Sequence, residues 1–143
     1  MIEILVAASI ITASVLAAMA VAQKSIYVAR QSFHTSQASF LLEEGAEAVR
    51  VLRDNAWTNI SSLTTGANYY PLFSSGTWTL SATSLQVGIF TRTVSMANVS
   101  RDSTTSDIVS SGGTNDASTK LVTVTVSSLV FNFKSLADIV FIP

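Results

Sequence analysis

Few side chains in this sequence could catalyse a reaction. His34 is the only histidine among 143 residues, so a histidine metal cluster is excluded and any Ser/His/Asp triad would need His34. Because no ligand-type residue stands beside it on a predicted helix, we interpret His34 as a polar residue on a helix face. The Gly112-Gly113 pair lacks the lysine and the helix that follow it in a phosphate-binding loop. We therefore expect no enzyme, no cofactor and no bound metal.

Three aspartates could contribute oxygen ligands to calcium. Asp102, Asp107 and Asp116 fall within a stretch rich in Ser, Thr, Gly and Asn. They lack the dense spacing of a calcium-binding loop such as the EF-hand. We interpret the whole stretch, residues 98–119, as an exposed loop.

A second acidic group lies close to arginines. Glu43, Glu44 and Glu47 precede Arg50 and Arg53 on the same predicted helix, and Glu47 stands three positions before Arg50. Residues three or four apart face each other on a helix, and an exposed pair contributes only a few tenths of a kcal/mol. This spacing favours a solvated helix face over an acid/base site.

Glu3 is the charged residue with the most unusual surroundings. It stands at the edge of an apolar stretch, Ile4 to Ala22, whose polar side chains are three hydroxyls, Ser9, Thr12 and Ser14. Hydroxyls of this kind can donate to carbonyls of their own helix. An unpaired carboxylate costs roughly 2.5–3.5 kcal/mol to place in a membrane, so Glu3 needs an exposed position or a positively charged partner.

The stretch from Ile4 to Ala22 has the length of a membrane span. As a helix it would extend about 28 Å, close to the thickness of the hydrocarbon core of a bilayer. Small side chains leave little bulk on much of its surface and allow other helices to approach closely. These small residues are Ala7, Ala8, Ala13, Ala17, Ala18, Ala20 and Ala22.

The helical pattern continues beyond this stretch. No Pro or Gly occurs before Gly45, and Asp54-Asn55 offers a stop. We predict one helix from Ile2 to Asp54, about 80 Å long, with residues 1–23 apolar all round and residues 24–54 amphipathic. The apolar residues at helical spacing in the second half include Ile26, Ala29, Phe33, Phe40, Leu41, Ala48 and Leu52.

The first nine residues carry a family resemblance. The run Met1-Ile2-Glu3-Ile4-Leu5-Val6-Ala7-Ala8-Ser9 resembles the start of a mature type IV pilin or pseudopilin, in which a glutamate precedes an apolar helix. In that family the glutamate is the fifth mature residue and pairs with the N-terminal amine of a neighbouring subunit; the match here is Glu3. Two residues of the motif are missing before Met1, so we expect the chain shown to be a mature or trimmed form.

The resemblance, which covers roughly the first twenty residues, implies a subunit of a helical homo-oligomer. The N-terminal half of the helix would enter a shared filament core, and its C-terminal half would lie against the subunit's own globular domain. The residues expected to contact other subunits are Glu3, Ile4, Leu5, Ala7, Ala8, Ile11, Val15 and Ala18. The implied partners are the inner membrane before assembly and a pilus assembly machinery.

Composition agrees with one span and one modest domain. Hydrophobic residues make up 48% and charged residues 12% of the chain, and the mean hydropathy of +0.46 is high for a soluble protein. The net charge of -1 argues against nucleic acid as an electrostatic partner. Cysteine is absent, which excludes disulfides and thiolate metal sites.

Residues 55–143 are expected to form a small β-sheet domain. Thr77–Ser81, Ile89–Met96 and the alternating run Val122–Val126 have strand patterns. The run Val130–Lys134 could extend the third strand or turn into a last strand near Leu136–Ile142, whereas residues 56–75 have an irregular pattern. We predict an α+β fold, with three or four antiparallel strands packing their apolar face on the long helix.

Three interpretations of function remain open. The first is a structural subunit of a type IV pilus-like filament, which would serve adhesion, surface motility or DNA uptake. The second is a pseudopilin of a secretion system, and the third is a single-span anchored binding domain that never polymerises. Lys24 and Arg30 after the span favour the cytoplasm for the C-terminal part, and a removed basic leader would reverse that preference.

Overall fold

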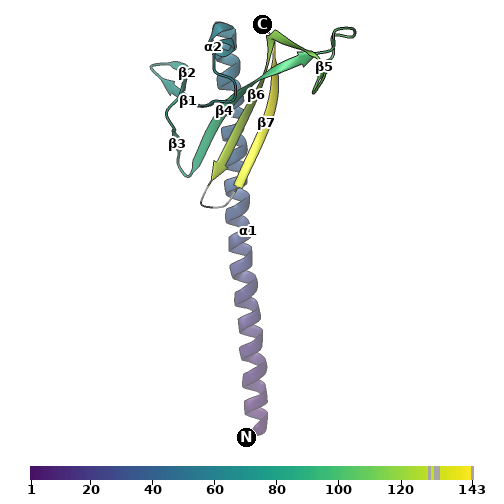
Figure 1. The fold of residues 1–143 in the computed structure, drawn as a ribbon. Coiled ribbons are helices and arrows are strands. Elements are labelled where there is room, and N and C mark those ends of the chain that lie inside the picture. Colours follow the sequence, from purple (N-terminus) through teal and green to yellow (C-terminus); the bar gives the residue numbers. More distant parts are fainter. Residues whose placement is uncertain (129, 131–132, 143) are drawn as a thin grey trace. The chain divides into compact units, whose positions relative to one another are not determined.

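The computed structural model describes residues 1–128, 130 and 133–142, with the backbone alone for Phe133 and Val140. The chain divides into two compact units, Met1–Gln37 and Ala38–Pro143. Figure 1 shows the elements in chain order, from the N-terminal helix in purple to the last strand in yellow.

The first unit is helical from Ile2 onward. It belongs to α1, Ile2–Asn55, a helix of 54 residues that matches the predicted helix Ile2–Asp54 to within one residue. No proline or glycine interrupts this part of the sequence, and leucine, alanine and methionine favour the helical state. Every residue from Met1 to Phe33 is exposed.

The described residues of the second unit form the remainder of α1, a short helix and seven strands. Antiparallel pairing places five strands in the order β2-β1-β4-β6-β7, and β3 and β5 also pair with β4. The bounds are α2 Thr58–Ser61, β1 Asn68–Ser74, β2 Thr77–Ser81, β3 Gln86–Val87, β4 Phe90–Arg101, β5 Ile108–Val109, β6 Thr114–Ser128 and β7 Phe133–Phe141. The α+β prediction is confirmed, and the number of strands exceeds the three or four expected.

The core of this unit lies between α1 and the long strands. Alternation along β6 buries Val122, Val124 and Val126, as predicted, while Thr123 and Thr125 point to the other face. The main buried cluster consists of Val49 from α1, Ile60 from α2, Val94 and Met96 from β4, Val122 and Val124 from β6, and Phe141 from β7.

Gly45 allows α1 to approach the sheet closely. A Cβ atom at this position would lie 2.8 Å from Val124 Cγ1 and 2.9 Å from Arg92 Cδ. The neighbouring helix positions that face the sheet are also small, since Ala38, Ala46 and Ala48 are buried. This face of α1 is therefore shaped for contact between its backbone and the side chains of the sheet.

Two predicted irregular stretches contain regular structure. Residues 56–75 include α2 and β1, and residues 98–119 include the end of β4, all of β5 and the start of β6. In both stretches the strands pair through backbone groups, so polar side chains do not prevent pairing. The run Val130–Lys134 falls partly on residues outside those described; β7 begins at Phe133.

Candidate functional site

The first unit carries an exposed apolar surface, the apolar segment Ile4–Ala22. Ile4, Leu5 and Ile11 are 75%, 72% and 63% exposed. Among the described residues, α1 is long and apolar enough to cross a membrane: its most apolar 18-residue window has a mean hydropathy of 2.5, and none of that window is buried. Exposure of such a surface to water is unfavourable, and contact with lipid or with another protein chain removes this cost.

The hydroxyls of the apolar segment are satisfied within the helix. Ser9 Oγ donates to the Val6 carbonyl at 2.7 Å, and Thr12 Oγ1 donates to that of Ala8 at 2.8 Å. Ser14 Oγ does the same to the Ile10 carbonyl at 2.8 Å. These bonds confirm the sequence-based expectation, and they leave no hydroxyl donor that needs a partner from another molecule.

The residues predicted to contact other subunits all lie on this exposed part of α1. Five of them, Ile4, Ala8, Ile11, Val15 and Ala18, recur at spacings of four and three, which places them along one side of the helix. Leu5 and Ala7 lie beside this row, and Glu3 precedes it. All eight residues are exposed.

Glu3 lies in the first turn of α1, where a negative charge interacts favourably with the helix dipole. Within the described part of the chain, no hydrogen bond or ion pair engages its carboxylate. The next charged residue along the helix is Lys24, whose Nζ lies 5.1 Å from the centroid of the Tyr27 ring. An uncharged stretch of helix, residues 4–23, therefore separates Glu3 from Lys24.

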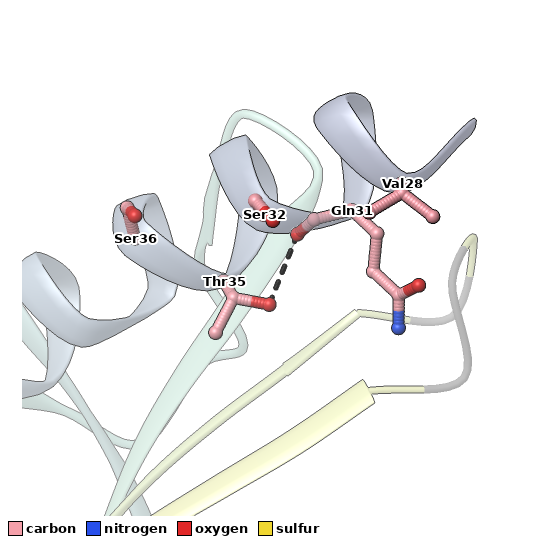
Figure 2. Close-up of a pocket in the computed structure, with 5 residues that line it drawn as sticks. All are labelled: Val28, Gln31, Ser32, Thr35 and Ser36. Carbon is pink, nitrogen blue, oxygen red and sulfur yellow. Dashed lines mark hydrogen bonds between the residues drawn. The ribbon is translucent and has the colours of Figure 1, made fainter. Parts of the chain in front are cut away.

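A depression of about 380 Å³ lies beside the polar part of the first unit (Figure 2). Its lining residues share one face of α1 and consist of Val28, Gln31, Ser32, Thr35 and Ser36. The Thr35 hydroxyl donates to the Gln31 carbonyl at 3.0 Å. Since none of the five side chains titrates near neutral pH, the depression offers no acid, base or anionic ligand for catalysis.

His34 occupies a half-buried position near the end of the first unit. Its Nδ1 lies 3.3 Å from Gln37 Oε1, and its ring meets the Phe33 ring edge-on at a centroid distance of 5.8 Å. Among the described residues, no group of three or more His, Cys, Asp or Glu side chains could hold a metal ion.

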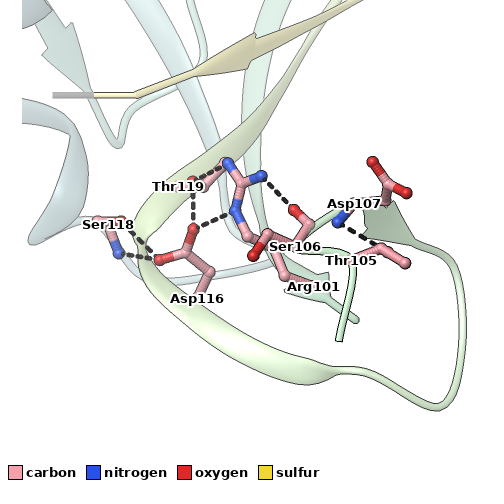
Figure 3. A network of polar contacts seen from close by, with 7 residues as sticks. All are labelled: Arg101, Thr105, Ser106, Asp107, Asp116, Ser118 and Thr119. Atoms are coloured by element: carbon pink, nitrogen blue, oxygen red, sulfur yellow. Dashed lines mark hydrogen bonds and ion pairs between the residues drawn. The ribbon is translucent and has the colours of Figure 1, made fainter. Parts of the chain in front are cut away.

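Two of the three aspartates considered for calcium, Asp102 and Asp116, instead form hydrogen bonds at the polar end of the sheet. Asp116 Oδ2 pairs with Arg101 Nε at 2.7 Å and accepts a 2.6 Å hydrogen bond from the Thr119 hydroxyl, and Ser118 Oγ donates to Oδ1 at 2.6 Å (Figure 3). The hydrogen bonds from Ser118, then Thr119 and Arg101, hold the pKa of Asp116 well below its ordinary value.

Asp102 and Arg101 extend this polar network into the neighbouring turn. Asp102 Oδ1 accepts from the backbone N–H groups of Thr105 and Thr104, at 3.0 and 2.7 Å, and these bonds lower its pKa. Arg101 Nη1 donates to the Ser106 carbonyl at 2.9 Å. The network therefore orders a turn and leaves the oxygens of Asp116 engaged by protein donors.

Arg92 forms an ion pair that sequence spacing did not reveal. Its side chain is 4% exposed, and Nη1 lies 2.9 Å from Glu44 Oε2 and 3.3 Å from the Leu41 carbonyl. The guanidinium also lies 5.5 Å from the centroid of the Trp78 ring, and its Nε is buried without a partner among the described residues. Arg92 thus joins α1, β2 and β4.

The expected pairs on α1 are confirmed in part. Glu47 pairs with Arg50, three positions on, as predicted. Arg53 pairs with Asp54 at 2.7 Å instead of with an upstream glutamate, and its guanidinium lies 5.1 Å from the Phe141 ring centroid. Of these two arginines, Arg53 packs on the buried Phe141 ring, whereas the Glu47–Arg50 pair is exposed.

Comparison of the chain with protein-family models, curated proteins and solved structures finds no match. A functional proposal for this chain therefore depends on its own residues and geometry.

Proposed function

We propose that the protein is a structural subunit of a type IV pilus-like filament and polymerises through its apolar segment. The observation that carries the proposal is the full exposure of this segment on a chain whose second unit has its own buried core. A folded domain does not need such a helix for its own stability, so the helix is available for contacts with lipid or with other copies.

The composition of the segment favours association with other helices. A simple anchor requires only apolar bulk, whereas this segment combines branched residues and alanines along the row Ile4, Ala8, Ile11, Val15 and Ala18. Small residues permit close approach of helix backbones, and branched residues fill the spaces between them. The same surface suits a membrane before assembly and a bundle of copies afterwards.

Glu3 adds a reason for assembly. A carboxylate at the edge of an apolar helix is costly in lipid when it has no partner, and within the described residues its own chain supplies none. Association that provides a positive charge removes this cost. The inner membrane would hold the subunit first, and the second unit would then form the surface of an extracellular filament.

The test is intact-mass spectrometry of protein sheared from the surface of the producing cells, compared with the membrane fraction. A dominant sheared species that lacks a leader and carries an N-terminal methyl group is the expected result. Protein confined to the membrane fraction would contradict the proposal. In that case a processed chain would indicate a pseudopilin, and an unprocessed chain would indicate a monomeric anchor.

A further inference from the structure

Charges of opposite sign stand at the two ends of the apolar segment. Glu3 lies at its N-terminal edge and Lys24 just after its C-terminal edge, and residues 4–23 contain no charged side chain. At 1.5 Å per residue, the two positions are about 32 Å apart along the helix axis. Both side chains are exposed.

Neither charge forms an ion pair with any residue of its own chain that the structure describes. Among the described residues no carboxylate forms an ion pair with Lys24, whose ammonium group contacts only the face of the Tyr27 ring, and no cation engages Glu3. A rigid helix keeps the two groups of one copy far beyond ion-pair distance. Two copies, however, can bring them together.

We infer that copies of this chain pack their apolar segments in parallel, displaced by about 32 Å, so that Glu3 of one copy pairs with Lys24 of the next. The inference rests on the proposed function, because copies drawn from one membrane share one orientation. Charge complementarity selects the displacement: parallel copies at equal height would place Glu3 beside Glu3 and Lys24 beside Lys24, which is repulsive.

Charge reversal tests the pair. Glu3→Lys and Lys24→Glu should each lower the amount of sheared filament by about tenfold or more, since each leaves two like charges at an apolar contact. The double variant Glu3→Lys/Lys24→Glu should restore at least part of the loss. Arg30→Glu is the matched control, because Arg30 lies farther from the segment and should leave filament yield unchanged.

The amount of each variant in the membrane fraction separates assembly from insertion. Equal membrane levels with reduced filament support the pair. Normal filament yield from Lys24→Glu, or no recovery in the double variant, would overturn the pairing while leaving the filament proposal intact. A wild-type chain that yields no sheared filament would overturn both.

Cross-linking tests the displacement directly, because the chain contains no cysteine of its own. The variant Ile2→Cys/Gln23→Cys keeps both charges and should give a ladder of multimers with a short bismaleimide, since each copy contacts one neighbour at each end. An antiparallel arrangement would give dimers only. Ala13→Cys alone should give no cross-link, and an efficient one would show copies at equal height or antiparallel, contrary to the inference.

Discussion

Asp116 accepts hydrogen bonds from Ser118, Thr119 and Arg101, and all of them favour its charged form. Its pKa is therefore lower in the folded chain than in the unfolded chain. A carboxyl group of this kind stabilises the fold at pH values above its unfolded pKa, near 4, and loses that contribution as the pH falls toward the folded value.

Replacement of Asp116 by asparagine should flatten the acid side of the stability profile. We expect Asp116→Asn to be less stable than wild type at pH 6 and the difference to shrink as the pH falls below about 4. The measurement is the urea midpoint of the full chain in mild detergent between pH 6 and pH 2.

Asp107→Asn provides the control for this profile. The Asp107 carboxylate makes no hydrogen bond or ion pair with any described residue. The Asp107→Asn profile should run parallel to that of wild type. A constant difference between Asp116→Asn and wild type at every pH would contradict the assignment.

Single residues also show where sequence reasoning reaches its limit. The Glu47–Arg50 pair could be predicted, because three-residue spacing on a helix fixes proximity. The Glu44–Arg92 and Arg101–Asp116 pairs could not, since their members belong to different elements or are separated by a turn. Their proximity depends on strand register and on how the sheet meets α1, and neither can be deduced from local patterns.

Among the elements, α1 is the one whose bounds the sequence predicted most accurately. A run without Pro or Gly up to Gly45 and a stop at Asp54-Asn55 predicted its bounds closely. The strand β1 was missed, because it lies within residues 56–75, whose pattern is irregular and includes a proline, Pro71, that argues against a central strand. In the described sheet, β1 pairs with β4 at Asn68 and Tyr69. Pro71 lies outside this pairing and faces a single neighbouring strand, β2.

The contact between α1 and the sheet predicts the effect of a methyl group at Gly45. Alanine improves helix propensity by about 1 kcal/mol. However, the new Cβ would meet Val124 Cγ1 and Arg92 Cδ at 2.8 and 2.9 Å, and Val124 is fully buried. We expect Gly45→Ala to lower the free energy of unfolding by about 1–3 kcal/mol, because overpacking outweighs propensity.

Urea unfolding of Gly45→Ala and wild type measures this difference. Glu43→Ala is the control on the same helix: Glu43 is exposed, and its replacement should change stability by less than about 0.5 kcal/mol. An unchanged or higher stability of Gly45→Ala would show that the sheet can withdraw from α1 without cost.

On the scale of the whole molecule, we expect the second unit to fold and stay in solution without the apolar segment. The second unit has its own buried cluster, and the apolar segment contributes nothing to that cluster. A chain lacking residues 1–22 should therefore be soluble without detergent, monomeric in size-exclusion chromatography, and equal to the full chain in its urea midpoint. Aggregation of this shortened chain, or a much lower midpoint, would show that the segment supports the fold.

The positions of the two tryptophans have a spectroscopic consequence. Both Trp57 and Trp78 belong to Ala38–Pro143, and Trp78 lies 5.2 Å from the Phe73 ring centroid and beneath the Arg92 guanidinium. Tryptophan fluorescence, excited selectively over that of tyrosine, thus originates from the second unit alone. Tryptophan emission can therefore follow the folding of the second unit whether the first unit is in detergent, in lipid or among other copies, since residues 1–37 contain no tryptophan.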